Sequence, residues 1–378
     1  MVRADIVTFA VGKLLNANPS TRVFTRDQML ACLSRRLPIQ FKATTYISET
    51  AEMKQVERHM RVCLNIDNGP GFQSMDTVAS SEPLLSEAAY FIMSLECFDA
   101  VTSLKIVLEE FAVHEGDRGE FVALLLLTLA RDQAVGLPDR DGRPEHRYFD
   151  SAPFVHGHLF KSSSASALEN LQCDFPDAKM HFNHFIKLHD FTSINKESLL
   201  RLMTRGAGVL CANSQPSIDA ATVFLKSGTK MTTDNFGVIL YRFKNDASYS
   251  ETPEPELFES MDPYDLGILG EGDAAVPIIK IVFALAATTP SLHVERHDAS
   301  EAYNAVVYDI WSAGLSPDYL NPIDPQQTDI WNDILQASYG SWDNIYKAAA
   351  NEDARRSMNP GAAFHGGHWS RWAVRGAK

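Results

Sequence analysis

The sequence has few cysteines, and none stands in a spacing that indicates a disulfide framework or a cysteine zinc site. The five cysteines are odd in number and contain no Cys-x-x-Cys pair. The apolar stretch at the N-terminus is too short for a secretory signal and is flanked closely by Asp5 and Lys13. We therefore expect no disulfide partners and an intracellular protein, cytoplasmic or nuclear.

Long hydrophobic runs are also missing. The two most apolar stretches, 121–130 and 278–288, are well below the roughly 18 residues that a membrane span needs. The sequence also lacks G-x-S-x-G, H-E-x-x-H, a phosphate-binding loop and a Gly-rich dinucleotide motif. These absences predict no membrane partner and argue against the common serine hydrolases, zinc proteases and nucleotide-binding folds.

The composition is that of a globular protein with an uneven charge distribution. Of 378 residues, 45% are hydrophobic and 22% are charged, and the net charge is −14. Seven basic and three acidic residues lie in 196–244, whereas 245–275 holds nine acids and neither Lys nor Arg. The acidity therefore argues against a protein whose whole surface binds nucleic acid, but it leaves room for a local basic groove.

Hydrophobic spacing predicts helices followed by a group of strands. Helical patterns cover 25–37, with Thr25 as a cap, and also 86–98, 120–132 and 195–205. Strand-like runs occupy 208–212, 217–225 and 236–243. The pattern leaves 278–288 open between helix and strand, and it favours helices around Trp311, Trp331 and Trp342 with a loose tail from 359.

The segment from Asp219 to Asn245 carries the best candidate for chemistry. Asp219 lies on one predicted strand, and Arg242 and Lys244 project from the same face at the end of the next. Metal-dependent phosphodiester cleavage needs carboxylate ligands for Mg²⁺ or Mn²⁺ and a cation near the reacting phosphate. Asp219 and Lys244 have the right side chains for those two roles.

This arrangement resembles the core of the PD-(D/E)XK nucleases, in which an Asp on one strand is followed by (Glu/Gln)-x-Lys on the next. The resemblance implies Asp219 as a metal ligand and Lys244 as a catalytic residue. It also implies a further Glu on a preceding helix. Glu120, after Gly119, is the preferred candidate as both catalytic residue and metal ligand, and Glu197 in the helix before the first strand is the alternative.

A broader resemblance covers most of the chain. Segments such as GDRGEFVALLLLTLARD, HFNHFIKLHDFTSINKESLL and FGVILYRFKND are similar to a large family of mushroom-forming (basidiomycete) fungi that has no established reaction. Members of that family usually read Gln-x-Lys-Asn in the final strand. This chain has Arg242 at the first of these positions, and a guanidinium cannot ligate a cation. We therefore expect Arg242 and Asn245 to bind substrate phosphate, in an enzyme that is either active or catalytically decayed.

These observations predict an α/β fold with a restriction-endonuclease-like mixed sheet core. The expected parts are a mostly helical region 1–109, a core 110–300 with an insertion at about 133–194, and a helical C-terminal extension with a loose tail, 301–378. The leading function is a nuclease-like phosphodiesterase that uses Mg²⁺ or Mn²⁺ and binds DNA or RNA. The oligomeric state is left open.

Two other functions stay open at this point. The first is a non-catalytic interaction or scaffold protein that retains the nuclease-like fold. The second is a metalloprotein that uses closely spaced histidines. The histidines concerned are His156, His158, His181, His184, His189, His365 and His368.

Overall fold

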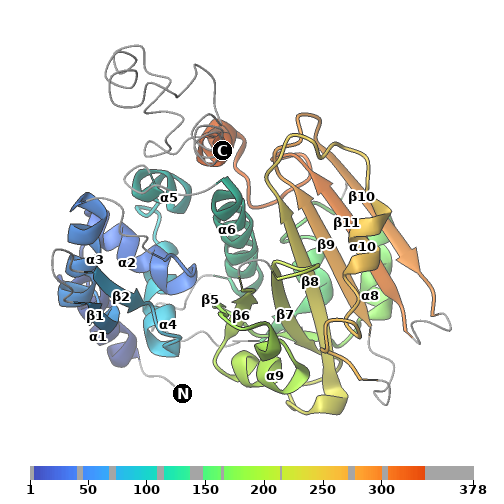
Figure 1. The fold of residues 1–378 in the computed structure, drawn as a ribbon, viewed down its shortest axis with the longest axis horizontal. Coiled ribbons are helices and arrows are strands. Elements are labelled where there is room, and N and C mark those ends of the chain that lie inside the picture. The colour runs from blue at the N-terminus through green and yellow to red at the C-terminus, as the bar shows by residue number, and fades with distance from the viewer. Residues whose placement is uncertain are drawn as a thin grey trace, which may run out of the picture.

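The computed structural model describes residues 4–40, 46–67, 74–108, 115–136, 148–162, 166–212, 215–270, 277–299 and 305–336. It shows a mixed α/β fold with an N-terminal group of helices beside a large, open, curled sheet (Figure 1). A long helix, α6 (Glu115–Val135), lies between the two parts. Within the described segments, no helix is both long and apolar enough to cross a lipid bilayer.

The N-terminal part contains five helices and one hairpin. The helices are α1 (Ala4–Leu15), α2 (Arg26–Arg36), α3 (Tyr46–Arg58), α4 (Pro83–Met93) and α5 (Ala100–Leu108). Between α3 and α4, strands β1 (Val62–Asp67) and β2 (Ser74–Val78) pair antiparallel. Helices predominate among the described residues of this region, and hydrophobic spacing did not predict its hairpin.

The main sheet has nine strands among the described residues. Its principal path runs β10-β11-β9-β8-β7-β4-β3, and β6 joins β7 and carries β5 on its other side. The pairs β8/β9, β9/β11 and β5/β6 are parallel, and the others are antiparallel. The strands are β3 (Phe149–Asp150), β4 (Lys179–Met180), β5 (His184–Lys187), β6 (Ala207–Leu210), β7 (Ala220–Leu225), β8 (Phe236–Lys244), β9 (Ile278–Ala284), β10 (Ser291–His297) and β11 (Val307–Ala313).

Side chains alternate across β8 and build a hydrophobic core on each face of the sheet. Ile239, Tyr241 and Phe243 belong to the core shared with α6 and the N-terminal helices, whereas Val238 and Leu240 belong to the core on the opposite face. The other helices are α7 (Ser151–Val155), α8 (Leu171–Asp174), α9 (Lys196–Thr204), α10 (Pro255–Ser260) and α11 (Thr328–Gln336). Helix α9 packs on β6 and β7, and α10 packs on β9.

Several expectations about the elements are confirmed and others are wrong. Helix α2 begins after the Thr25 cap, and the three strand-like runs form β6, β7 and β8. The run left open at 278–288 forms strand β9. Trp311 lies in strand β11, not in a helix, whereas Trp331 does lie in a helix. Trp342 and the tail from 359 are outside the described residues.

The expected domain limits do not follow the sheet. The segment treated as an insertion supplies three strands, because β3, β4 and β5 all join the main sheet. The limit at 300 separates β10 from β11, which pair along their whole length. The sheet therefore includes strands from 133–194 and extends beyond residue 300.

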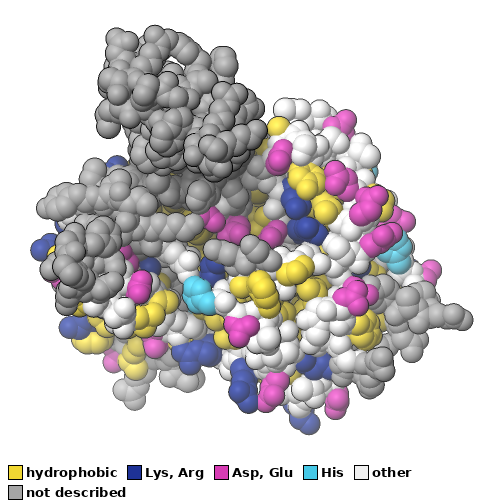
Figure 2. Space-filling view, in the orientation of Figure 1, with side chains coloured by type: hydrophobic (Ala, Val, Ile, Leu, Met, Phe, Trp, Pro, Cys, Tyr) yellow, Lys and Arg dark blue, Asp and Glu magenta, His cyan; other side chains and the backbone are white. Residues whose placement is uncertain are grey.

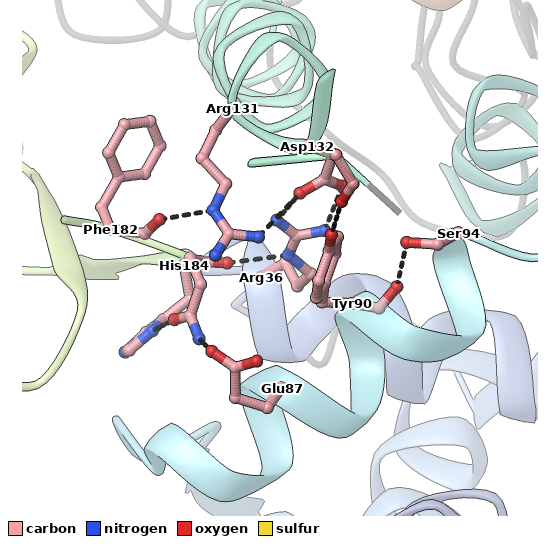
Figure 3. Close-up of polar contacts among 10 residues, drawn as sticks. Arg36, Glu87, Tyr90, Ser94, Arg131, Asp132, Phe182 and His184 are labelled. Carbon is pink, nitrogen blue, oxygen red and sulfur yellow. Dashed lines mark hydrogen bonds and ion pairs between the residues drawn. The ribbon is translucent and has the colours of Figure 1, made fainter. Parts of the chain in front are cut away.

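A buried polar network attaches the N-terminal helices to the sheet (Figure 3). Arg36 on α2 donates to both carboxylate oxygens of Asp132 on α6, at 2.6 and 2.7 Å, and to the carbonyl of Asn183 at 2.7 Å. Arg131 donates to Asp132 at 3.1 Å and to the carbonyl of Phe182 at 2.7 Å. Because both arginines are completely buried, these contacts fix α2 and α6 against the start of β5.

Candidate functional site

Asp219 lies directly before β7, opposite the end of β8. Its Oδ2 accepts a hydrogen bond from the backbone N–H of Phe243 at 2.5 Å. Its own N–H donates to the carbonyl of Tyr241, and its carbonyl accepts from Cys211 N–H. The Phe243 N–H therefore holds the carboxylate, and the backbone hydrogen bonds fix Asp219 between β8 and the end of β6.

Glu120 reaches the same end of the sheet from α6. A Cβ at Gly119 would lie only 2.7 Å from the Cβ of Asn245, so the glycine allows α6 to approach the end of β8 closely. Glu120 Oε2 lies 3.6 Å from Nζ of Lys187, the last residue of β5. The Lys187 side chain is 9% exposed, so this ion pair is largely shielded from water.

Glu120, Asp219 and the charged residues around them shift one another's pKa values. Burial raises the pKa of Glu120 to about 7, Lys187 opposes that rise, and Asp117 and Asp219 add to it. Burial likewise raises the pKa of Asp219, against the Phe243 hydrogen bond and the charges of Lys244, Arg242 and Lys187. We call Glu120, Lys187, Asp219 and Lys244 the strand-end cluster.

The two expected substrate-binding residues have other contacts in the structure. Arg242 Nη1 donates to Ser260 Oγ on α10 at 2.8 Å. Asn245 Nδ2 donates to the carbonyl of Leu335 on α11 at 3.5 Å. Both remain next to the strand-end cluster in the chain, and the charge of Arg242 lowers the pKa of Asp219. Lys244 Nζ lies 5.2 Å from the centre of the Tyr249 ring.

Glu197 is not part of the strand-end cluster. It lies in the first turn of α9, its side chain is 71% exposed, and it pairs with Arg201 one helical turn later. An acid in that position stabilises the helix, because it interacts favourably with the helix dipole and forms an i,i+4 ion pair. Of the two candidate helix acids, the structure brings Glu120 to Asp219.

The histidines do not form a metal-binding group among the described residues. No set of three or more His, Cys, Asp or Glu side chains converges in the part of the chain that the structure describes. His181 Nδ1 contacts the carbonyl of Met203, and His189 Nε2 lies 3.4 Å from Gln40. His184 contacts Ser81 and Asn183, and His156 contacts the carbonyl of Ser162. His365 and His368 lie outside the described residues.

Glu120 and Asp219 remain as a pair of carboxylates that suits a hard cation. Mg²⁺ is commonly held by one or two carboxylates, with water and substrate phosphate completing the coordination. Burial raises the pKa of both carboxyl groups, and a cation bound between them would lower these pKa values and favour the ionised forms. The pair therefore fits Mg²⁺ or Mn²⁺ only with further oxygen ligands from substrate or water.

Sequence reasoning missed one member of the strand-end cluster, Lys187, which ends the short run HFIK. Cys211, which follows β6, lies beside the cluster; burial raises the pKa of its thiol, and Asp219 and Glu120 add to the rise. A lysine that ends an apolar strand was a usable signal for Lys187. No local pattern showed that β5 lies next to β6, which is the pairing that brings Lys187 to the site.

Comparison with known proteins gives one match. A family model described as a domain of unknown function, DUF8736, matches residues 28–260, more than half of the chain. The chain belongs to the DUF8736 family. The matched region includes Glu120, Lys187, Asp219 and Lys244, and it ends before β9, β10 and β11. No curated protein and no solved structure matches the chain.

Proposed function

We propose that the chain is a phosphodiesterase that cleaves DNA or RNA with Mg²⁺ or Mn²⁺, on a core of the restriction-endonuclease type. The observation that carries the proposal is the meeting of Glu120, Asp219 and Lys244 at one end of the sheet. Two carboxylates with an adjacent ammonium group have the chemistry that phosphodiester hydrolysis requires. The antiparallel pair β7/β8, with Asp219 before one strand and Lys244 ending the other, supports the same assignment.

Each residue has a separate task in this proposal. Asp219 and Glu120 would hold the divalent cation, which supplies Lewis-acid polarisation of a phosphoryl oxygen when it is bound. Lys244 places a positive charge where negative charge develops on the scissile phosphate. Arg242 would contact a neighbouring phosphate, for which its guanidinium must exchange Ser260 for the substrate.

A cleavage assay tests the proposal directly. Purified protein is incubated with single- and double-stranded DNA and RNA in Mg²⁺ or Mn²⁺. We expect cleavage by the natural protein, and a loss on the order of 100-fold or more for Asp219→Asn and for Lys244→Met. Glu197→Gln is the matched control, because that exposed carboxylate on α9 lies outside the strand-end cluster, and its rate should be unchanged.

A binding measurement separates the metal from the chemistry. Titration of the protein with Mn²⁺, followed by electron paramagnetic resonance, should show binding that Asp219→Asn and Glu120→Gln remove and Glu197→Gln does not. Absence of Asp219-dependent cleavage on every substrate would contradict the enzymatic proposal. Absence of Mn²⁺ binding in the presence of oligonucleotide would contradict the metal site as well.

One observation favours a second candidate function, that of a non-catalytic interaction protein. The ammonium group of Lys187 already lies 3.6 Å from Glu120 and neutralises part of the charge that would attract a metal. Arg242 adds a further positive charge near Asp219. In a non-catalytic protein the Lys187–Glu120 ion pair would stabilise the sheet end, so Lys187→Met would lower stability and Mn²⁺ would not restore it.

A further inference from the structure

A second polar site lies further along the sheet, at strands β9, β10 and β11, on the face that α10 covers. A groove of about 1290 Å³ lies between the α10 segment and strands β9, β10 and β11. That volume exceeds the range of about 300–1,000 Å³ that is typical of small-molecule pockets. We call it the β10 groove, and its size suits a chain segment better than a small metabolite.

The groove reaches the outer edge of the sheet. Six consecutive residues, from His293 to Asp298, line it, including residues that point to both faces of β10. Strand β10 is the last strand of the main path and, among the described residues, it pairs with β11 alone. Its outer backbone N–H and C=O groups therefore offer a ladder to an added strand.

The lining of the groove is acidic. Its acids are Glu259, Asp262, Glu295, Asp298 and Asp309, against the two permanent cations Lys280 and Arg296. Arg296 is already paired with Asp174 at 2.8 Å and also with Asp298. Asp and Glu side chains gather over the region of α10 and β10, on the right of the molecule in Figure 2. The excess of negative charge favours a cationic occupant.

Asp309 is the acid in the groove best placed to bind a cationic side chain. It lies in register with Glu295 on one neighbouring strand and with Lys280 on the other. Its Oδ2 lies 3.1 Å from His297 Nε2, whereas its Oδ1 is buried and has no hydrogen-bond partner among the described residues. A buried carboxylate oxygen without a donor is costly, and a guanidinium or ammonium group would satisfy it.

We propose that the β10 groove binds an extended peptide segment rich in Lys or Arg, which adds as a strand to the edge of β10. Peptide backbone groups pair with β10, and one cationic side chain donates to Asp309. The other cationic side chains lie near Glu295 and Glu259. Seven residues of β10 extend over about 23 Å at 3.3 Å per residue, so a peptide of similar length covers the strand. This site is independent of the strand-end cluster.

Fluorescence anisotropy with a labelled peptide that alternates arginine and valine tests the proposal. We expect saturable binding to the full chain, and no binding of the same peptide with glutamate in place of arginine. Asp309→Asn should weaken binding about tenfold, and Glu295→Gln should also weaken it. Glu295 is 77% exposed, so its loss leaves the fold intact and keeps the test valid if Asp309→Asn folds poorly. Asp234→Asn, an exposed acid away from the groove, should change nothing.

Two further binding measurements distinguish strand addition from simple charge attraction. An arginine peptide that is N-methylated at alternate backbone positions keeps its charge but loses the donors of a β-ladder, so it should bind at least tenfold more weakly. Equal binding of the methylated peptide would overturn strand addition. Binding of spermine as tightly as the peptide, or no binding of the arginine peptide, would overturn the proposal of a peptide site.

Discussion

The buried residue His184 makes the free energy of unfolding depend on pH. Burial, together with the positive charges of Arg36, Arg205, His181 and Arg131, lowers its pKa from 6.5 to about 3. The folded state therefore binds this proton less readily than the unfolded chain does. The stability that depends on neutral His184 is therefore present above about pH 6.5 and is lost as the pH falls towards 3.

Replacement of His184 by glutamine should flatten this pH dependence. Urea unfolding of the natural protein should show a free energy of unfolding that falls by a few kcal/mol between about pH 6.5 and 4.5. His184→Gln should start lower at pH 7, because contacts with Ser81 and Asn183 are lost, and fall less on acidification. The exposed His189 is the control, and His189→Gln should keep the natural slope. Equal slopes for His184→Gln and the natural protein would contradict the argument.

Residue roles were predictable from the sequence only where the local pattern carried them. Asp219 and Lys244 stand at fixed positions relative to two recognisable strands, so their meeting followed from strand pairing. The ion pair of Lys187 with Glu120 depends on β5 pairing with β6 and on the close approach of α6 to β8. Neither contact has a short-range signal in the sequence.

The local sequence determines where helix α2 begins. Gln28 N–H donates to Thr25 Oγ1 at 3.4 Å, and Thr25 N–H donates to Gln28 Oε1 at 3.0 Å. Thr25→Ala should lower the free energy of unfolding by about 1 kcal/mol, because it removes the acceptor for a helix-end N–H. Thr25→Ser keeps the hydroxyl and should restore most of the loss, as measured by urea unfolding. A loss of the same size for both variants would show that the hydroxyl is not responsible.

Strand β8 depends on the glycine at its second position, Gly237. A Cβ at Gly237 would lie 2.2 Å from the ring of Phe224, which is completely buried on β7. Gly237→Ala should therefore lower stability by about 1–3 kcal/mol through overpacking. Gly12→Ala in α1 is the matched control, since its Cβ would meet ordinary contacts and its effect should be neutral or stabilising.

A double variant tests the mechanism of that loss. Phe224→Leu removes the ring that the new methyl group would meet. The double variant Gly237→Ala, Phe224→Leu should therefore be more stable than the sum of the two single changes predicts. Simple additivity would show that steric conflict with Phe224 is not the cause.

Elements with strong local signals were predicted well, and elements that depend on partners were not. Capped amphipathic helices such as α2 and α9 carry their own start signals. Strand β10 (SLHVERH) alternates polar residues with Leu292 and Val294 but is polar throughout its last three positions, so its apolar pattern is short. Strand β11 holds two aromatics, which at that length suit a helix or a strand equally. Their pairing with each other and with β9 decided the outcome.

At the scale of the whole molecule, one core runs from the N-terminal helices through α6 to one face of the sheet. Six consecutive residues of α6, Val122 to Leu127, are completely inaccessible to water. A helix that is buried on all sides needs neighbours all round it, and here these are the N-terminal helices and the sheet. The continuous apolar run predicted a buried helix, but it held no information on which elements cover it.

Asp132 is the carboxylate on which the polar junction between these parts depends. It accepts hydrogen bonds from Arg36 and Arg131, two guanidinium groups with no exposed side-chain surface (Figure 3). Asp132→Asn would leave both charges buried without their counter-ion, so we expect a loss of about 3–5 kcal/mol in the free energy of unfolding. Hydrogen exchange should also rise in α2 and at the start of β5, the segments that the two arginines connect.

The exposed pair Lys105–Asp333 supplies the comparison for that experiment. It also joins two helices, α5 and α11, but its side chains are 33% and 53% exposed, so Asp333→Asn should cost less than about 1 kcal/mol. Urea unfolding of both variants, with hydrogen exchange read separately for α2 and β5, measures the difference. If Asp132→Asn were as mild as Asp333→Asn, the attachment of the N-terminal helices would rest on apolar packing alone. The larger loss that we expect would assign the junction to the buried charges, because Asp132 pairs with two completely buried guanidinium groups, whereas Asp333 pairs with one partly exposed ammonium group.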